Sequence, residues 1–177
     1  LCLLANKLAS LDPFGLGVEM EADKPNWFDA LNGLPGLFGS SLNETFELKR
    51  LVLFIKSSID KSGIEKINIT EEIYNFLAQL DKLIQECLNN NSEGRDFKYW
   101  DKSYSLKETY RERTKLGVSG NEIEMTTVEL NVILNNSLKK IDIGLNKAFD
   151  KKRKIYAAYF INEVREYVKL ESSFIKP

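Results

Sequence analysis

Acidic residues near the N-terminus of the chain have neighbours that could give a carboxyl group a chemical role. Asp29 directly follows the aromatic residues Trp27 and Phe28. A carboxyl group packed against aromatic rings loses hydration, and this raises its pKa. A raised pKa is what a general acid needs if it is to act near neutral pH. Asp29 is therefore a candidate catalytic acid. The alternative interpretation is that Asp29 caps a short helix over residues 30–32 while Trp27 is a core residue.

Two further acidic residues, Glu19 and Glu21, lie two positions apart in the same stretch. An extended segment would place both side chains on one side of the chain. Trp27 could offer a flat apolar face to a sugar ring. Glu19, Glu21 and Trp27 are therefore candidate site residues.

Ser40 and Ser41 follow a glycine-rich stretch and precede a predicted helix. The free backbone N–H groups of a helix N-terminus, together with two hydroxyl groups, favour an anion or a hydroxyl-rich ligand. Ser41 also begins the capping-box sequence Ser41-Leu42-Asn43-Glu44, so a purely structural role for this hydroxyl is the alternative.

The elements that would position these residues are a long loop and a series of helices. Residues 13–39 hold three of the four prolines and five of the ten glycines, together with several aromatic residues. Long, turn-rich, apolar loops inside compact domains are usually functional. Apolar spacing predicts helices near the N-terminus and over residues 41–62, 70–88, 95–116, 126–145 and 155–170. Strand-like alternation is confined to short stretches such as residues 64–69, so the predicted fold class is all-α.

Composition limits the function further. The chain has 177 residues, no histidine and a formal net charge of −1, which fits one domain and gives no electrostatic reason to expect a nucleic-acid partner. The absence of histidine excludes Ser-His-Asp catalysis and His-ligated metals within this chain.

Two distant cysteines form no disulfide framework, no segment predicts a membrane span, and we expect a cytoplasmic protein. The basic run 151–154 is interpreted as a solvated face rather than a binding patch.

Residues 19–41 read EMEADKPNWFDALNGLPGLFGSS. This stretch resembles large bacterial proteins related to cellobiose phosphorylase, in the six-hairpin (α/α)6-barrel glycosidase superfamily. The closest resemblance covers about residues 12–50, and a weaker one continues through the later helices. In cellobiose phosphorylases a Trp-Asn-Asp-Gly stretch supplies the aspartate that protonates the leaving glycosidic oxygen. Trp27 and Asp29 match that stretch, whereas Phe28 and Ala30 replace its Asn and Gly.

The resemblance implies helical hairpins forming part of an (α/α)6 toroid whose loops surround a carbohydrate. It implies Asp29 as the general acid, with an oligosaccharide or disaccharide as substrate. The residues expected to contact that substrate are Trp27, Phe28, Lys24, Asn32, Ser40 and Ser41. A closed toroid needs roughly 300 residues or more at ordinary helix and loop lengths. We therefore expect the chain to be a fragment of a larger catalytic domain, to have the remainder of that parent chain as a partner, and to be inactive in isolation.

The reaction class stays open between phosphorolysis and hydrolysis. A phosphorylase uses inorganic phosphate as co-substrate, with Ser40 and Ser41 as candidates for its cradle, and needs no other cofactor or metal. An inverting hydrolase needs a second carboxylate to activate water, and Glu19 or Glu21 is then the candidate base. The competing classes are a non-enzymatic helical interaction domain, with residues 12–41 as a structural plug, and a domain that binds sugar without cleaving it.

Overall fold

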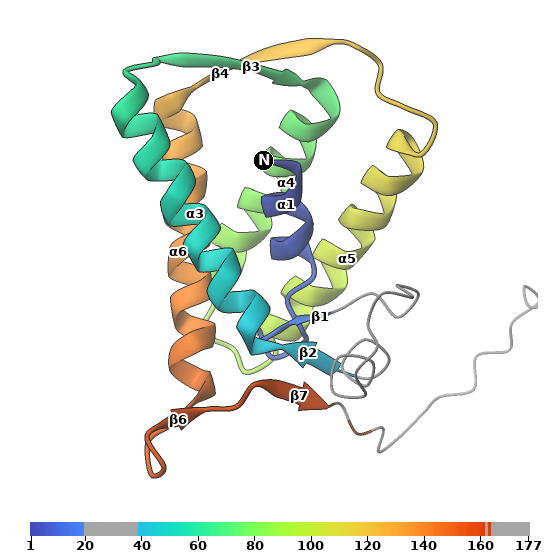
Figure 1. Ribbon diagram of the computed structural model, residues 1–177. Helices are drawn as coiled ribbons and strands as arrows, with labels where there is room; N and C mark the ends of the chain where they lie inside the picture. The colour runs from blue at the N-terminus through green and yellow to red at the C-terminus, as the bar shows by residue number, and fades with distance from the viewer. Residues whose placement is uncertain (20–38, 162, 164–177) are drawn as a thin grey trace, which may run out of the picture.

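The computed structural model describes residues 1–19, 39–161 and 163. Four long helices surround a short one in this part of the chain (Figure 1). The central helix is α1 (Cys2–Ala9), and its inner residues Leu4, Ala5, Leu8 and Ala9 have no exposed surface. The long helices are α3 (Leu42–Ser62), α4 (Glu71–Asn89), α5 (Arg95–Thr114) and α6 (Thr127–Ala148). The core thus forms where α1 packs against α3, α4 and α5.

Local sequence signals set the ends of the long helices. The Ser41 hydroxyl accepts a hydrogen bond from the backbone N–H of Glu44 at 3.4 Å, which makes it the N-cap of α3. Gly63 ends the same helix with φ +65°, a left-handed conformation that favours glycine. Thr126 caps α6 through the N–H of Glu129 at 3.1 Å. The predicted starts of α3, α4 and α6 are confirmed.

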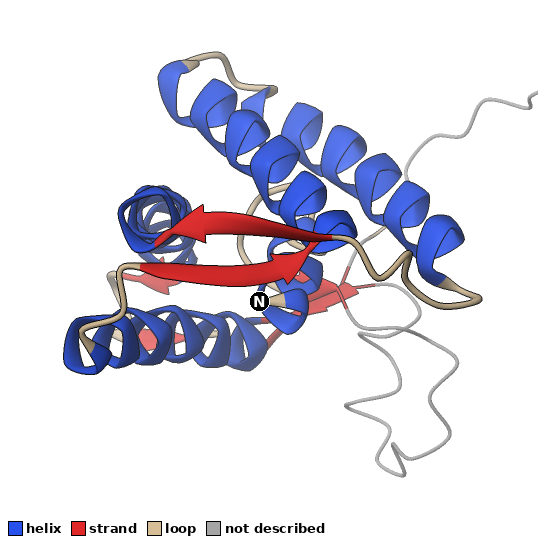
Figure 2. Cartoon of the chain, turned by 90° about the horizontal axis from the view of Figure 1, so that it is seen from above, coloured by secondary structure: helices blue, strands red, loops and turns tan. Residues whose placement is uncertain are grey.

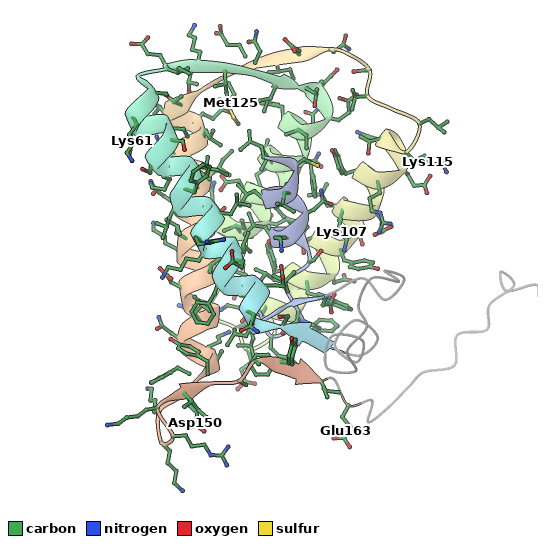
Figure 3. All side chains as sticks on the ribbon, viewed as in Figure 1. Lys61, Lys107, Lys115, Met125, Asp150 and Glu163 are labelled. Carbon is green, nitrogen blue, oxygen red and sulfur yellow. The ribbon has the colours of Figure 1, made fainter. Side chains whose placement is uncertain are left out.

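An antiparallel ribbon joins the helices at one end of the bundle. It consists of β3 (Lys66–Thr70), which leads into α4, and β4 (Glu122–Thr126), which leads into α6. Figure 2 shows the ribbon crossing the end of the bundle. Ile67 pairs with Met125, and the Met125 side chain is fully buried beneath the ribbon (Figure 3). The ribbon therefore closes the core at this end.

Two further small sheets lie at the opposite end (Figure 1). β2 (Gly39–Ser41) forms the middle of a three-stranded antiparallel sheet, between β1 (Val18–Glu19) and β7 (Tyr159–Ile161). A hairpin of β5 (Phe149–Asp150) and β6 (Ile155–Tyr156) continues directly from α6. Gly39 is required in β2 because a Cβ atom there would lie 1.9 Å from the carbonyl oxygen of Phe160.

The predicted all-α fold class is wrong. The described residues are 63% helical and carry three small antiparallel sheets, so the fold is mixed α and β, and they show no toroid. The strands are only two to five residues long, too short for their alternation to outweigh the helical pattern around them. In β4, Ile123 and Met125 alternate with exposed Glu122 and Glu124.

The helix predicted over residues 155–170 is also wrong where the structure describes it. Residues 155–161 hold β6 and β7 instead. The Asp150 carboxylate accepts the N–H groups of Lys152 and Arg153 at 2.9 and 3.0 Å, which closes the chain into a turn before a helix can begin. The basic residues 151–154 stand at the tip of this hairpin and are exposed.

Among the described residues, no helix combines the length and the apolar character needed to cross a lipid bilayer.

Candidate active site

The turn that follows α1 is organised by Asp12, a carboxylate that is only 2% exposed. Its Oδ1 atom accepts the N–H groups of Phe14 and Leu16 at 3.0 and 2.9 Å, and its Oδ2 atom accepts that of Gly17 at 2.9 Å. A buried carboxylate is stable in the fold only when such donors replace its hydration. Asp12 therefore fixes the path of the chain into β1.

Ser40 joins this turn to β2. Its hydroxyl group donates to Asp12 Oδ2 at 2.6 Å, and its backbone pairs with Glu19 in the β1–β2 register. A Cβ atom at Gly17 would lie 2.3 Å from the Ser40 hydroxyl oxygen, so only glycine leaves room for this contact. The two strands flanking residues 20–38 are thereby held side by side, with Glu19 and Ser40 at paired positions.

A polar stripe along α5 holds the C-terminal end of α1 from the other side. The Tyr99 hydroxyl donates to the carbonyl oxygen of Leu8 at 3.0 Å, and that of Ser103 donates to the carbonyl of Ala9 at 3.3 Å. Lys107 Nζ donates to the Ser10 hydroxyl at 3.0 Å. The last carbonyl groups of a helix lack partners within the helix, so this stripe explains why α5 carries buried polar residues at helical spacing.

Glu19 is the predicted site residue whose carboxyl group packs against α5. Both oxygens of its half-buried carboxyl group lie 3.1 Å from the indole nitrogen of Trp100, which donates from α5. Burial raises the pKa of Glu19 above its ordinary value of 4.5, and the negative charge of Asp12 adds to the rise. The Trp100 hydrogen bond and the positive charge of Lys107 oppose it. Burial prevails, so proton exchange by Glu19 moves toward neutral pH.

Aromatic side chains extend from Trp100 along the same helix. The ring centroids of Phe97 and Trp100 are 5.4 Å apart, and those of Trp100 and Tyr104 are 6.3 Å apart. Phe97 and Tyr104 are 59% and 42% exposed. Lys107 Nζ lies 4.4 Å from the centroid of the Tyr104 ring, a favourable cation–π geometry. Beside Glu19, α5 thus presents a partly exposed aromatic row made of Phe97, Trp100 and Tyr104.

One helical turn earlier on α5, Asp96 lies in a contrasting environment. Lys140 Nζ donates to its Oδ1 atom at 2.5 Å, Lys147 pairs with its Oδ2 atom, and the Arg95 guanidinium lies 3.9 Å away. Burial by itself would raise the pKa of Asp96, but the hydrogen bonds and charges of Lys140 and Lys147 hold it below the ordinary value of 3.8. Asp96 therefore stays ionised and ties α5 to α6.

The structure describes three of the predicted site residues and brings them together. Glu19, Ser40 and Ser41 lie on the paired strands β1 and β2. Both hydroxyl groups have protein partners, since Ser40 donates to Asp12 and Ser41 caps α3. Their role in a phosphate cradle stays a prediction. The remaining predicted site residues lie outside the described part of the chain: Glu21, Lys24, Trp27, Phe28, Asp29 and Asn32.

The sequence prediction missed the residues that surround Glu19. Trp100 lies 81 positions from Glu19, and Lys107 lies 97 positions from Ser10. No local sequence pattern therefore indicates that these residues are in contact. The sequence feature that could have indicated the aromatic row is the spacing of Phe97, Trp100 and Tyr104, because this spacing places aromatic rings along one side of a helix. Asp12 could have been recognised from the glycines after it, because Asp and Gly together favour tight turns.

No protein-family model matches the chain, and no curated protein matches it either. Within residues 1–19, 39–161 and 163, no three Cys, Asp or Glu side chains gather as a metal-binding group.

Proposed function

We propose that this chain supplies two catalytic carboxyl groups, Glu19 and Asp29, to a larger enzyme that acts on glycosidic bonds. The observation that carries the proposal is Glu19 itself. Its half-buried carboxyl group has a raised pKa, binds Trp100, and stands where β1 enters residues 20–38. That segment contains the Trp-Phe-Asp stretch on which the resemblance to cellobiose-phosphorylase-related proteins rests.

Each carboxyl group has a distinct role in this proposal. Asp29 donates a proton to the glycosidic oxygen as the bond to the anomeric carbon breaks. Glu19 accepts a proton from the water molecule whose oxygen forms the new bond to that carbon. Inverting hydrolysis needs such a pair of carboxyl groups, whereas phosphorolysis replaces the water with phosphate and does not require the base. The raised pKa of Glu19 supports a role in proton transfer, because an acid–base residue works best when its pKa lies near the pH of its environment.

Glu19→Gln is the variant that tests this role. Cleavage of cellobiose and of longer β-linked glucosides is measured with and without inorganic phosphate, in this chain and in the longer protein that the resemblance implies. We expect Glu19→Gln to lower hydrolysis by about 10²–10⁴-fold, the usual contribution of an acid–base residue, and Asp29→Asn to lower hydrolysis and phosphorolysis alike. Glu47→Gln, on the exposed face of α3, is the control and leaves both rates unchanged. Unchanged hydrolysis in Glu19→Gln contradicts the assignment of Glu19 as the base.

The aromatic row supports a second candidate function, sugar binding without cleavage. Partly exposed rings of Phe97 and Tyr104 flank Trp100, and flat apolar surfaces of this kind suit the C–H faces of a pyranose. Calorimetric titration with cellobiose separates the two functions. A binder retains affinity in Glu19→Gln and shows no turnover even in the longer protein that the resemblance implies, whereas an enzyme turns over substrate there.

A further inference from the structure

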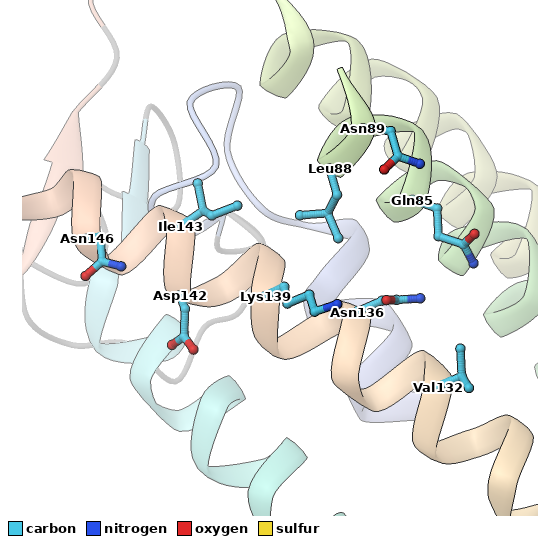
Figure 4. A pocket seen from close by; sticks show the side chains of 9 residues that line it. All are labelled: Gln85, Leu88, Asn89, Val132, Asn136, Lys139, Asp142, Ile143 and Asn146. Atoms are coloured by element: carbon cyan, nitrogen blue, oxygen red, sulfur yellow. The ribbon is translucent and has the colours of Figure 1, made fainter. Parts of the chain in front are cut away.

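A hollow lies between the C-terminal half of α4 and the outer face of α6. It is an open groove of about 700 Å³ (Figure 4). Its lining includes no residue of the Glu19 site. Its walls carry amide side chains from both helices: Gln85 and Asn89 from α4, and Asn136 and Asn146 from α6. We name it the amide groove.

A buried carboxylate orients two of these amides. Asp81 of α4 is 7% exposed, and its Oδ2 atom accepts the Gln85 amide N–H at 2.5 Å while its Oδ1 atom accepts that of Asn136 at 2.9 Å. The amide nitrogens of Gln85 and Asn136 are thus directed toward Asp81. Their carbonyl oxygens have no hydrogen-bond partner within the described chain, and remain as acceptors for a ligand.

The rest of the lining adds donors, acceptors and aliphatic surface. Asn89, Lys139 and Asn146 are exposed, and their side chains make no hydrogen bond to other described residues. Leu88 and Ile143 are half-buried and supply apolar surface between the polar groups. A recognition site of this kind combines apolar contact with a few oriented polar groups.

The charges of the groove argue against a strongly charged ligand. Lys139 and Asp142 contribute opposite charges, and Asp142 is also paired with Lys49 at 2.7 Å. The Asp81 carboxylate is already occupied by two amides. Peptides are commonly recognised by a free strand edge, by a hydrophobic groove that takes an amphipathic helix, or by an aromatic-lined groove. Among its described residues, this groove has no strand edge and no aromatic ring, and it is lined largely by amide and charged side chains. Neutral hydroxyl groups, which donate and accept, match it better.

We propose that the amide groove binds a neutral oligosaccharide, with Gln85 and Asn136 contacting its hydroxyl groups and Asp81 acting as the positioning residue. The inference is independent of the Glu19 chemistry, since the two sites share no residue. A groove of this kind would hold a glycan chain on the protein between α4 and α6.

The experiment is a titration of the ¹⁵N-labelled full chain with cellotetraose and maltotetraose, followed by backbone amide chemical shifts. We expect saturable shifts at residues 85–89 and 136–146 with at least one of the two saccharides. Asn136→Ala is expected to weaken this binding about tenfold, the loss of roughly one well-placed hydrogen bond. Asp81→Asn, which keeps the shape and removes the second acceptor, is expected to weaken it comparably. Gln79→Ala, at an exposed amide on α4 outside the groove, is the matched control and leaves the affinity unchanged.

Two further variants keep the proposal testable if Asn136→Ala or Asp81→Asn fails to fold. Lys139→Ala and Asn146→Ala change exposed side chains and are expected to weaken binding about threefold each while leaving the circular dichroism spectrum unchanged. Glu19→Gln retains full affinity in the groove. The proposal is overturned if neither saccharide shifts the groove residues, if a peptide binds there and saccharides do not, or if all groove variants bind as tightly as the unmodified chain.

Discussion

Two carboxyl groups near the same end of α5 meet opposite environments. Asp96 is surrounded by Lys140, Lys147 and Arg95, and its pKa lies below the ordinary value. Glu19 reaches the same helix one turn later through Trp100, and its pKa lies above the ordinary value. Both groups are substantially buried, so burial alone does not explain the difference. The number of cationic partners at hydrogen-bond distance does.

Asp96 has the environment of a structural carboxylate, whereas Glu19 has an environment suited to proton transfer. Asp96 has lost the capacity to exchange a proton near neutral pH, and what it provides is a tie between α5 and α6. Burial raises the pKa of Glu19, and the hydrogen bond from its neutral indole partner on α5 opposes this rise only in part. Pairs of titratable groups whose pKa values are pushed apart by their environments are characteristic of sites that need defined protonation states. The contrast therefore identifies Glu19, rather than Asp96, as the group to test for catalysis.

Asp96→Asn should produce the largest effect, because it leaves the Lys140 ammonium, which is 2% exposed, without its anion. Breaking a buried ion pair typically costs about 3–5 kcal/mol, and urea unfolding at pH 7 measures the loss. Asp101→Asn, at an exposed position of α5, is the control. The stability that Asp96 contributes is present above its unfolded pKa of about 3.8 and is lost as the pH falls through its lower folded value. A loss below about 1 kcal/mol would show that the Asp96 cluster does not hold α5 to α6.

Gly144→Ala tests how the Asp12 turn is seated on α6. A Cβ atom at position 144 would lie 2.0 Å from the carbonyl oxygen of Gly15, so the turn would have to move. Overpacking of this kind costs about 1–3 kcal/mol, measured by thermal unfolding. Gly94→Ala is the matched control, because a Cβ atom there meets nothing within 4 Å. Equal stability of the two variants would mean that the turn adjusts freely and does not fix the position of β1.

Local signals predicted much of the helical framework. Ser41, Gly63, Thr70 and Thr126 mark helix ends that the structure confirms. The β1–β2–β7 and β3–β4 sheets were not predicted because their strands are held by partners distant in sequence, as when β2 pairs with β7. The β5–β6 hairpin is local, but its strands are two residues long, too short to give an alternation signal.

The residues around Glu19 and Asp96 were not predicted because they too are distant in sequence. Lys140 lies 44 positions from Asp96, and Trp100 lies 81 positions from Glu19. Packing of α1, α5 and α6 creates these neighbours, and no periodicity within one segment encodes them. The residue type at position 19 was recognised as chemically useful, while the shift of its pKa depended on tertiary burial. The role of Asp29 stays a prediction, because position 29 lies outside the described residues.

Trp100→Phe should have the smallest effect on stability and the most specific one on Glu19. The change keeps an aromatic ring and removes the N–H donor that stabilises the ionised carboxylate, so the pKa of Glu19 is expected to rise further. The cost is about 1 kcal/mol near neutral pH, that of one hydrogen bond. Tyr104→Phe, which removes a neighbouring hydroxyl from the same aromatic row, is the control. An unchanged Glu19 titration in Trp100→Phe would show that the Trp100 N–H does not influence the pKa of Glu19.

The opposite pKa shifts of Glu19 and Asp96 are tested most directly by a site-resolved ¹³C NMR titration of both carboxyl groups between pH 2 and 8. The signals are assigned with Glu19→Gln and Asp96→Asn. A raised folded pKa stabilises the fold fully below the unfolded value of about 4.5, and this stabilisation is lost as the pH rises through the folded value. We therefore expect Glu19 to titrate above 4.5 and Asp96 below 3.8. Glu19→Gln should also abolish the decline in stability above pH 4.5 that belongs to Glu19. A Glu19 midpoint at or below 4.5 would contradict the claim that this carboxyl group is poised for proton transfer.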